Sequence, residues 1–240
     1  MSFYQQLSEY YDEIFSFNEA EAAFLKTRLE RMQSMLDIGC ATGGKTVLFA
    51  GQMERVVGID ADESMIAMAR EHHFAPNVTY LPMDMRALAE NFQPKSFDAV
   101  LCLGNTLAHL DSHEAMARLI KDMASVARER IIIQIVNYDR IIDQHISELP
   151  TVQTRHVVFT RQYKWDNRQL HFMTAIINRE NNQTFSNDII LTPLRKHELA
   201  LMLNHAGFAT QRYYDDFNGG PWRADSFATI VVAEQAKDTT

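Results

Sequence analysis

The sequence predicts an α/β protein built on a doubly wound, mostly parallel sheet of seven strands, with an antiparallel β insertion after the fifth strand. Short, almost wholly apolar segments alternate with amphipathic ones between residues 35 and 136, which is typical of a parallel sheet covered by helices on both faces. The first apolar segment ends in a glycine-rich turn, and longer strand-like segments with polar turns follow residue 154. With 240 residues, 46% of them hydrophobic, the chain is large enough to bury such a core.

The amino-terminal half supplies the parallel part of the sheet. Two amphipathic helices come first, over residues 3–15 and 19–32, and Asn18 with Glu21 has the spacing of a capping box. Five strands are expected at residues 35–38, 56–59, 78–81, 97–103 and 131–136. Helices are expected between them at residues 45–52, 64–71 and 113–127, the last two capped by Asp62 and Asp111.

The carboxyl-terminal half completes the sheet after the insertion. The insertion strands are expected at residues 155–165, 170–177 and 184–191. A helix over 193–205, ended by Gly207, and strands at 210–214 and 226–233 return the chain to the core. We therefore divide the chain into a helical lid (1–33), a cofactor-binding α/β core (34–144 and 192–236) and an insertion (145–191) that faces the substrate.

Composition narrows the class of partner. The formal net charge is −8, from 23 Lys and Arg against 31 Asp and Glu, so the average field repels nucleic acid. Neither a basic leader nor an apolar run of about 18 residues is present, which predicts a cytoplasmic protein with no membrane partner. Cys40 and Cys102 lack disulfide spacing, and the adjacent pair His72-His73 points apart on a helix, so no metal site is expected.

Three carboxylates at successive strand ends form the strongest chemical signal. Asp37 opens the glycine-rich turn, Asp60 ends the next strand 23 residues later, and Asp84 follows the third strand. Ligands of open α/β sheets bind at the carboxyl ends of the strands, where Asp60 can accept hydrogen bonds from a ribose diol and Asp84 suits an adenine amino group. A dinucleotide fingerprint would place glycine at Ala41, so this arrangement favours S-adenosylmethionine (SAM) over a nicotinamide cofactor, which stays an alternative.

At these motifs the chain resembles class I SAM-dependent methyltransferases, over residues 11 to 233. The resemblance implies that Gly39 and its neighbours hold the methionine part of SAM, and that Asp37 supports the loop and the cofactor ammonium. It also implies a lid tyrosine at Tyr11, which closes over the cofactor. The full set of expected cofactor contacts is Tyr11, Asp37, Gly39, Cys40, Ala41, Gly43, Asp60, Ala61, Asp84, Met85, Leu101 and Leu103.

Two further segments resemble glycine and sarcosine N-methyltransferases and related small-molecule N-methyltransferases. The first begins Gly104-Asn105 and ends Ala108-His109-Leu110, and the second is Asn137-Tyr138-Asp139. The resemblance implies a small-molecule acceptor with an amine nitrogen. The arginine that binds a substrate carboxylate in that family would precede Asn137, but Val136 stands there, so an amino-acid acceptor stays open.

Transfer to a neutral amine needs alignment and desolvation more than a strong base. If the acceptor is instead a hydroxyl or a carbon of a small metabolite, Tyr138 or His109 is a candidate general base. Expected substrate contacts are Asn105, Asn137, Arg161 and Trp222. A non-catalytic SAM-binding regulatory module is a further alternative, and an exposed antiparallel edge would allow a homodimer.

Overall fold

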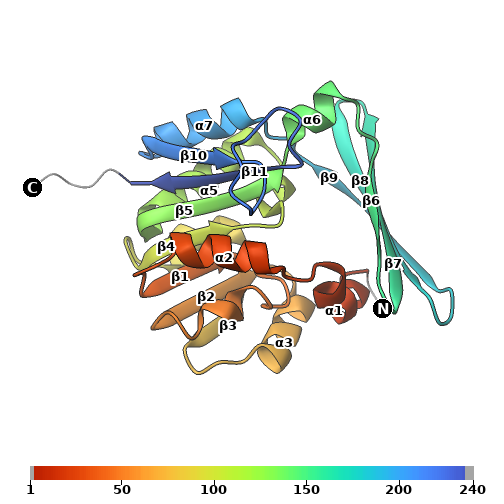
Figure 1. Ribbon diagram of the computed structural model, residues 1–240, viewed down its shortest axis with the longest axis horizontal. Helices are drawn as coiled ribbons and strands as arrows, with labels where there is room; N and C mark the ends of the chain where they lie inside the picture. The colour runs from red at the N-terminus through yellow and green to blue at the C-terminus, as the bar shows by residue number, and fades with distance from the viewer. Residues whose placement is uncertain (1–2, 236–240) are drawn as a thin grey trace, which may run out of the picture.

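The computed structural model describes residues 3–235 and contains two sheets (Figure 1). The larger sheet has seven strands in the order β10-β11-β5-β4-β1-β2-β3, with β11 antiparallel to both of its neighbours and the other pairs parallel. Its strands are β1 (Ser34–Ile38), β2 (Arg55–Asp60), β3 (Val78–Pro82), β4 (Phe97–Cys102), β5 (Ala127–Val136), β10 (Thr210–Tyr214) and β11 (Ala228–Glu234). The expected doubly wound, mostly parallel sheet is confirmed.

Helices and short 3-10 turns connect these strands. They are α1 (Phe3–Ile14), α2 (Glu19–Arg28), η1 (Thr46–Phe49), α3 (Glu63–His72), η2 (Met85–Ala87), α4 (Leu88–Asn91), η3 (Thr106–His109), α5 (His113–Val126), α6 (Tyr138–Asp143) and α7 (Lys196–His205). Helices α5 and α7 cover one face of the large sheet through residues such as Met116 and Leu199. Helix α2 and η1 cover the other face through Phe24 and Phe49.

The alternation of side chains along β1 determines on which face of the sheet the Asp37 carboxylate lies. Leu36 and Ile38 belong to the core cluster under α5, whereas Met35 belongs to the cluster under α2. Because successive side chains of a strand face opposite ways, Asp37 turns toward the α2 side. The hydroxyl of Thr46, on η1, meets it there.

The second sheet is antiparallel, in the order β6-β7-β8-β9. Its strands are β6 (Glu148–Gln153), β7 (Val157–Asp166), β8 (Gln169–Asn178) and β9 (Thr184–Leu191). It stands at one end of the core, and α1 lies between the two (Figure 1). The antiparallel insertion is therefore present where the sequence placed it.

Several expected boundaries were wrong. The second helix ends at Arg28, and a 3-10 turn over Thr46–Phe49 replaces the helix expected at 45–52. Ser112, not Asp111, caps α5, because the Ser112 hydroxyl accepts from the amide of Ala115. Helix α7 begins only at Lys196, whose amide is bound by the Asp139 carboxylate. Strand β6 and helix α6 were missed, since neither has a periodic pattern of its own.

Candidate active site

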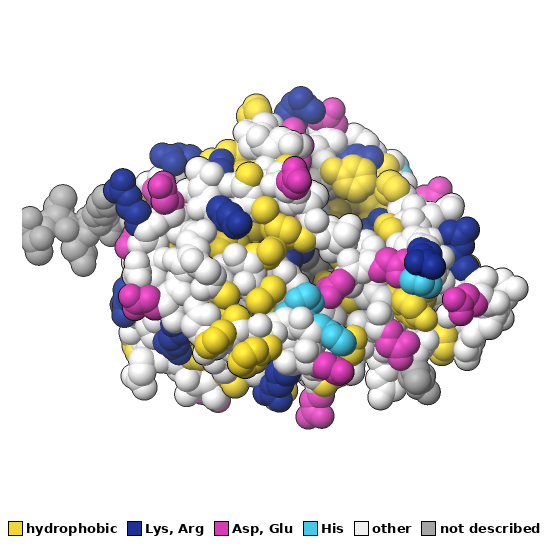
Figure 2. Space-filling model, turned by 60° about the horizontal axis from the view of Figure 1, so that its bottom comes forward, with side chains coloured by type: hydrophobic (Ala, Val, Ile, Leu, Met, Phe, Trp, Pro, Cys, Tyr) yellow, Lys and Arg dark blue, Asp and Glu magenta, His cyan; other side chains and the backbone are white. Residues whose placement is uncertain are grey.

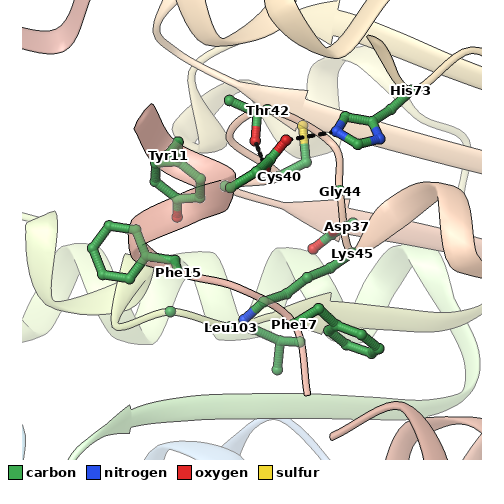
Figure 3. A pocket seen from close by; sticks show the side chains of 13 residues that line it. Tyr11, Phe15, Phe17, Asp37, Cys40, Thr42, Gly44, Lys45, His73 and Leu103 are labelled. Atoms are coloured by element: carbon green, nitrogen blue, oxygen red, sulfur yellow. Dashed lines mark hydrogen bonds and ion pairs between the residues drawn. The ribbon is translucent and has the colours of Figure 1, made fainter. Parts of the chain in front are cut away.

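The glycine-rich turn after β1 forms the floor of a cavity of about 200 Å³. The amides of Gly39 and Cys40 donate to the carbonyl of Ile59, at the end of β2, over 2.8 and 3.0 Å. Gly39 and Gly43 have φ of +74° and +80°, conformations that glycine adopts readily. The cavity is lined by Tyr11, Asp12, Phe15, Phe17, Asp37, Gly39, Cys40, Thr42, Gly44, Lys45, His73, Leu103 and Gly104, most of which Figure 3 labels.

Two buried carboxylates shape this turn. Asp37 accepts from Thr46 Oγ1 over 2.6 Å, and burial, only partly offset by Thr46 and Lys45, raises the pKa of Asp37 to about 6. Asp60 accepts from the amides of Ala41 and Asp62 over 2.9 and 3.0 Å, one bond to each carboxylate oxygen. Burial also raises the pKa of Asp60. Each Asp60 oxygen keeps a lone pair for a further donor.

Helix α1 forms one wall of the cavity with Tyr11 and Asp12, and it is fixed on two sides. The Asp12 carboxylate accepts from Thr42 Oγ1 over 2.5 Å and pairs with His73 Nε2 over 2.7 Å (Figure 3). On the opposite side, Glu13 pairs with His156 Nδ1, just before β7, over 2.9 Å. Helix α1 is therefore fastened both to the core and to the second sheet.

The structure reveals cavity residues that sequence reasoning missed. Lys45 forms an ion pair of 2.8 Å with the buried Glu21, and Phe15 and Phe17 add two rings to the lining. A cation directly after Gly43-Gly44 is a signal that could have found Lys45. Nothing local to the sequence pairs Asp12 with His73, because 61 residues separate them.

Five of the expected cofactor residues line the cavity, namely Tyr11, Asp37, Gly39, Cys40 and Leu103. Asp60 and Ala61 lie at the end of β2, further along the same sheet edge. Asp84 faces Arg86, with oxygen–nitrogen distances of 2.7 to 3.1 Å. Contacts of SAM with the expected residues outside the cavity stay predictions; these are Ala41, Gly43, Asp60, Ala61, Asp84, Met85 and Leu101.

Beyond Leu103, the end of β4 meets the end of β5 at a polar pair. Asn105, with φ of +69°, approaches the Tyr138 hydroxyl with its Nδ2 at 3.0 Å, and its Oδ1 accepts from the Val136 amide over 3.1 Å. Tyr138 is fully buried, and burial raises the pKa of its hydroxyl. Tyr138 is thus held as a neutral hydrogen-bonding group against Asn105, the residue that follows Gly104 of the cavity lining.

The other expected catalytic and substrate residues occupy different surroundings. Asn137 Nδ2 donates to the carbonyls of Ala224 and Ser226 over 3.0 and 2.9 Å, and so orders the turn before β11. Trp222 Nε1 donates to Thr229 Oγ1 over 2.9 Å. His109 is exposed on η3, although nearby atoms desolvate the imidazole enough to lower its pKa. Their substrate roles stay predictions.

The lining suits the charges of SAM. A buried carboxylate, Asp37, and the rings of Tyr11, Phe15 and Phe17 favour a cation such as an ammonium or a sulfonium. Lys45 adds a positive charge to the same lining. Within residues 3–235, no group of three or more His, Cys, Asp or Glu side chains could hold a metal ion, and no helix of that range is long and apolar enough to cross a membrane.

The fold and this cavity define an α/β protein with a ligand site at the carboxyl ends of its parallel strands. Residues 35–130 match a family described as Methyltransferase domain. A glycine/sarcosine N-methyltransferase of Aphanothece halophytica is 24% identical over 95% of this chain and 87% of its own length. A glycine/sarcosine/dimethylglycine N-methyltransferase of Actinopolyspora halophila is 24% identical over 92% of this chain, which spans only 40% of that protein.

Solved structures agree on the architecture. The CcbJ methyltransferase of Streptomyces caelestis superposes with a TM-score of 0.79 at 21% identity, over 98% of this chain and 99% of that one. Residues 35–130 are thus a methyltransferase domain, and the whole chain has the fold of SAM-dependent methyltransferases.

Affinity for the product S-adenosylhomocysteine (SAH) should fall as the pH drops through about 6. We expect ionised Asp37 to attract the ligand ammonium, and because the folded-state pKa of Asp37 is raised to about 6, that attraction should be present above this pH and lost below it. Calorimetric titration between about pH 5 and pH 7.5 measures the effect. Asp37→Asn should weaken binding at the upper pH and remove most of this dependence; an unchanged profile in that variant would contradict the assignment.

Proposed function

We propose that this chain transfers the methyl group of SAM to an amine nitrogen of a small molecule. The observation that carries the proposal is the neutral, buried Tyr138 hydroxyl, paired with Asn105, which directly follows Gly104 of the cavity lining. Such a group can hydrogen-bond an acceptor but is a poor base, which matches an amine that attacks through its own lone pair. The names of the relatives, N-methyltransferases of glycine and sarcosine, support the same acceptor atom.

When bound, SAM supplies an electrophilic methyl group on a sulfonium. The acceptor nitrogen forms the new bond to carbon, the carbon–sulfur bond breaks with its electron pair left on sulfur, and the methylated ammonium releases its proton to water. This chain contributes binding through Asp60 and Lys45, a negative charge that attracts the cofactor's cationic groups through Asp37, and exclusion of water by α1 at the cavity wall. Tyr138 and Asn105 orient the acceptor.

The proposal also assigns a role to each part of the chain. We assign residues 1–33 to the lid, 34–144 with 192–236 to the SAM-binding core, and 145–191 to the substrate side. The fastening of Asp12 to Thr42 supports the first assignment. On the face turned forward in Figure 2, acidic, basic and hydrophobic side chains are interspersed, which supports a small-molecule partner over nucleic acid. Cys40 and Cys102 are buried and not joined in a disulfide, which supports a cytoplasmic location. A homodimer stays a prediction.

An O- or C-methyltransferase is the second candidate. The lowered pKa of His109 keeps its imidazole neutral and able to accept a proton at physiological pH, and this observation favours an acceptor that must be deprotonated. A non-catalytic SAM-binding module would bind SAM without turnover, so the same assay separates it from both enzymes.

The experiment supplies SAM with a labelled methyl group, together with paired amines and alcohols of the same carbon skeleton. Label in the amines but not in the alcohols is the expected result. Label in the alcohols alone, together with loss of turnover in His109→Ala, would replace the proposal by the second candidate. Binding of SAM without any transfer to the panel would count for the regulatory module.

Tyr138→Phe should lower kcat at least tenfold while leaving SAH affinity within about twofold. Removing the hydroxyl takes away a positioning hydrogen bond and leaves the half-buried Asn105 amide short of a partner, a loss worth about 1 to 3 kcal/mol. Tyr213→Phe is the matched control, because the Tyr213 hydroxyl bonds Gln211 on the edge strand β10, away from the cavity. Equal kcat values for the two variants would remove Tyr138 from the proposed site.

A further inference from the structure

Helix α1 lies between the core and the second sheet and packs against both (Figure 1). Its residues Leu7 and Ile14 belong to one apolar cluster, which contains sheet residues and core residues. The sheet contributes Val157, Phe159 and Ile176, and the core contributes Ala41 and Met65. Phe15, directly after the helix, adds an edge contact with Phe159, at 5.6 Å between ring centres. Apolar burial therefore holds α1 firmly on the second sheet.

Polar side chains also fasten α1 to the second sheet. Asn178 Nδ2, at the end of β8, donates to Tyr10 Oη over 3.1 Å. The Glu13 carboxylate accepts from the amide of His156 over 3.1 Å and meets its Nδ1 at 2.9 Å. Burial alone would raise the pKa of Glu13, but hydrogen bonds from Thr154 and His156 outweigh it and lower the pKa to about 2. Glu13 thus stays ionised, and the helix is tied to the sheet at two separate points.

On the core side, one side chain makes two polar contacts. The Asp12 carboxylate accepts from Thr42 Oγ1, in the glycine-rich turn, over 2.5 Å and meets His73 Nε2, at the end of α3, at 2.7 Å (Figure 3). Water reaches this pair, because the Asp12 and His73 side chains are 53% and 23% exposed. An ion pair open to water shifts an equilibrium constant by about fivefold at most. We call these two contacts of Asp12 the core latch, and they are weak enough to break and re-form.

The cavity beside α1 is smaller than the usual site for a ligand of the size of SAM. It holds about 200 Å³, whereas such sites hold about 300 to 1000 Å³. Tyr11, next to Asp12, lines the cavity and lies within electrostatic reach of both Asp37 and Asp60. A ligand that extends from Asp37 to Asp60 therefore needs Tyr11, and with it α1, to shift.

We infer that α1 is a gate for cofactor exchange and that the core latch of Asp12 controls its opening. When Asp12 releases Thr42 and His73, α1 moves away from the glycine-rich turn and stays on the second sheet, and SAM or SAH passes through the opening. The latch joins groups of this chain alone, so it slows entry and release of the ligand alike. The inference rests on the proposed function for the identity of the ligand and adds how its exchange is regulated.

Surface plasmon resonance of SAH on the immobilised protein measures the two rate constants, kon and koff. Asp12→Asn keeps an acceptor for Thr42 but loses the charge that pairs with His73, so kon and koff should both rise about two- to fivefold. Because both rates change together, Kd should stay within about twofold of the wild-type value.

Glu13→Gln is the matched control for this variant. Glu13 is the next residue of the same helix and also pairs with a histidine, but its partner, His156, belongs to the sheet side. Its rate constants should stay at the wild-type values, because Tyr10 and the apolar cluster still hold α1 on the sheet. Unchanged rates in Asp12→Asn, equal acceleration in both variants, or a rise in koff alone would overturn the inference. The last outcome would make Asp12 a ligand contact instead of a latch.

A disulfide between positions 12 and 44 tests the gate in the opposite direction. A Cβ at Gly44 would lie 3.6 Å from Asp12 Cγ, close to the spacing of a bridged pair, and the φ of Gly44 is not in the left-handed range. The double variant Asp12→Cys, Gly44→Cys should exchange SAH faster than the wild type when reduced. After oxidation by glutathione disulfide it should exchange SAH at least about tenfold more slowly, and dithiothreitol should restore the fast rates. Equal rates in the two forms, with the disulfide verified by mass spectrometry, would overturn the inference.

The gate and the methyl transfer can fail separately. Methylation of amines, with exchange rates that Asp12→Asn leaves unchanged, would keep the proposed function and refute the gate. Exchange of SAH that depends on Asp12, without methyl transfer to any acceptor, would keep the gate and refute the function. Absence of SAH binding to the wild-type protein would overturn both.

Discussion

Gly43→Ala should destabilise the protein by about 2 to 5 kcal/mol. Gly43 has φ of +80°, and a Cβ there would lie 2.6 Å from the Tyr80 hydroxyl and 2.7 Å from the Tyr80 ring. Tyr80 is 4% exposed and its hydroxyl reaches the carbonyls of Gly43 and His73, so the ring has little room to move. The left-handed conformation costs alanine roughly 1 to 2 kcal/mol and overpacking adds roughly 1 to 3 kcal/mol. Urea denaturation followed by circular dichroism measures the loss.

Gly51→Ala provides the matched control, because its Cβ would meet nothing within 4 Å and its φ is not in the left-handed range. That variant should unfold at the wild-type urea concentration or slightly above it, since alanine restricts the unfolded chain. Equal stability of Gly43→Ala and Gly51→Ala would mean that Gly43 does not have a left-handed backbone packed against Tyr80.

The sheet could be predicted because its signals are local. Leu36 and Ile38 are apolar on the side that α5 covers, and the turn at Gly39 interrupts the strand where the backbone must change direction. Asn18 and Asp62 were correctly expected as helix caps because a cap is also a local contact. Each side chain accepts hydrogen bonds from backbone amides two or three residues further along the chain. The choice of Ser112 over the adjacent Asp111 depends on the entry angle of the chain, which a sequence pattern does not contain.

The arrangement around the cavity depends on contacts between distant residues. Asp12 and Thr42 are 30 residues apart, and Asn137 binds carbonyls more than 80 residues away. Such pairs exist only once the sheet has brought its strand ends together, so composition and spacing cannot reveal them. Arg161 was expected at the substrate side, but its hydrogen bond to the Pro150 carbonyl, over 2.8 Å, could be seen only from the packed sheet.

Asp60→Ala should weaken SAH binding by about 2 to 4 kcal/mol, or roughly 30- to 1000-fold in Kd. The amides of Ala41 and Asp62 hold the Asp60 carboxylate in one orientation, which leaves a lone pair on each oxygen for the two hydroxyls of a ribose. Removing the carboxylate deletes both charge-assisted hydrogen bonds and frees the Ala41 amide from its partner. Isothermal titration calorimetry of the wild type and the variant at one pH measures the difference.

Asp62→Ala separates this effect from loss of stability. Asp62 follows the same strand, but its carboxylate caps α3 by accepting from Ser64 and Met65, so its removal should cost about 1 kcal/mol of folding free energy and leave SAH affinity nearly unchanged. If Asp60→Ala and Asp62→Ala lowered SAH affinity equally, the loss would reflect a loosened turn. A large loss confined to Asp60→Ala means that the end of β2 binds the ribose, which fixes the adenosine on the β3 side of the sheet edge and directs the methionine part toward Asp37 and Lys45.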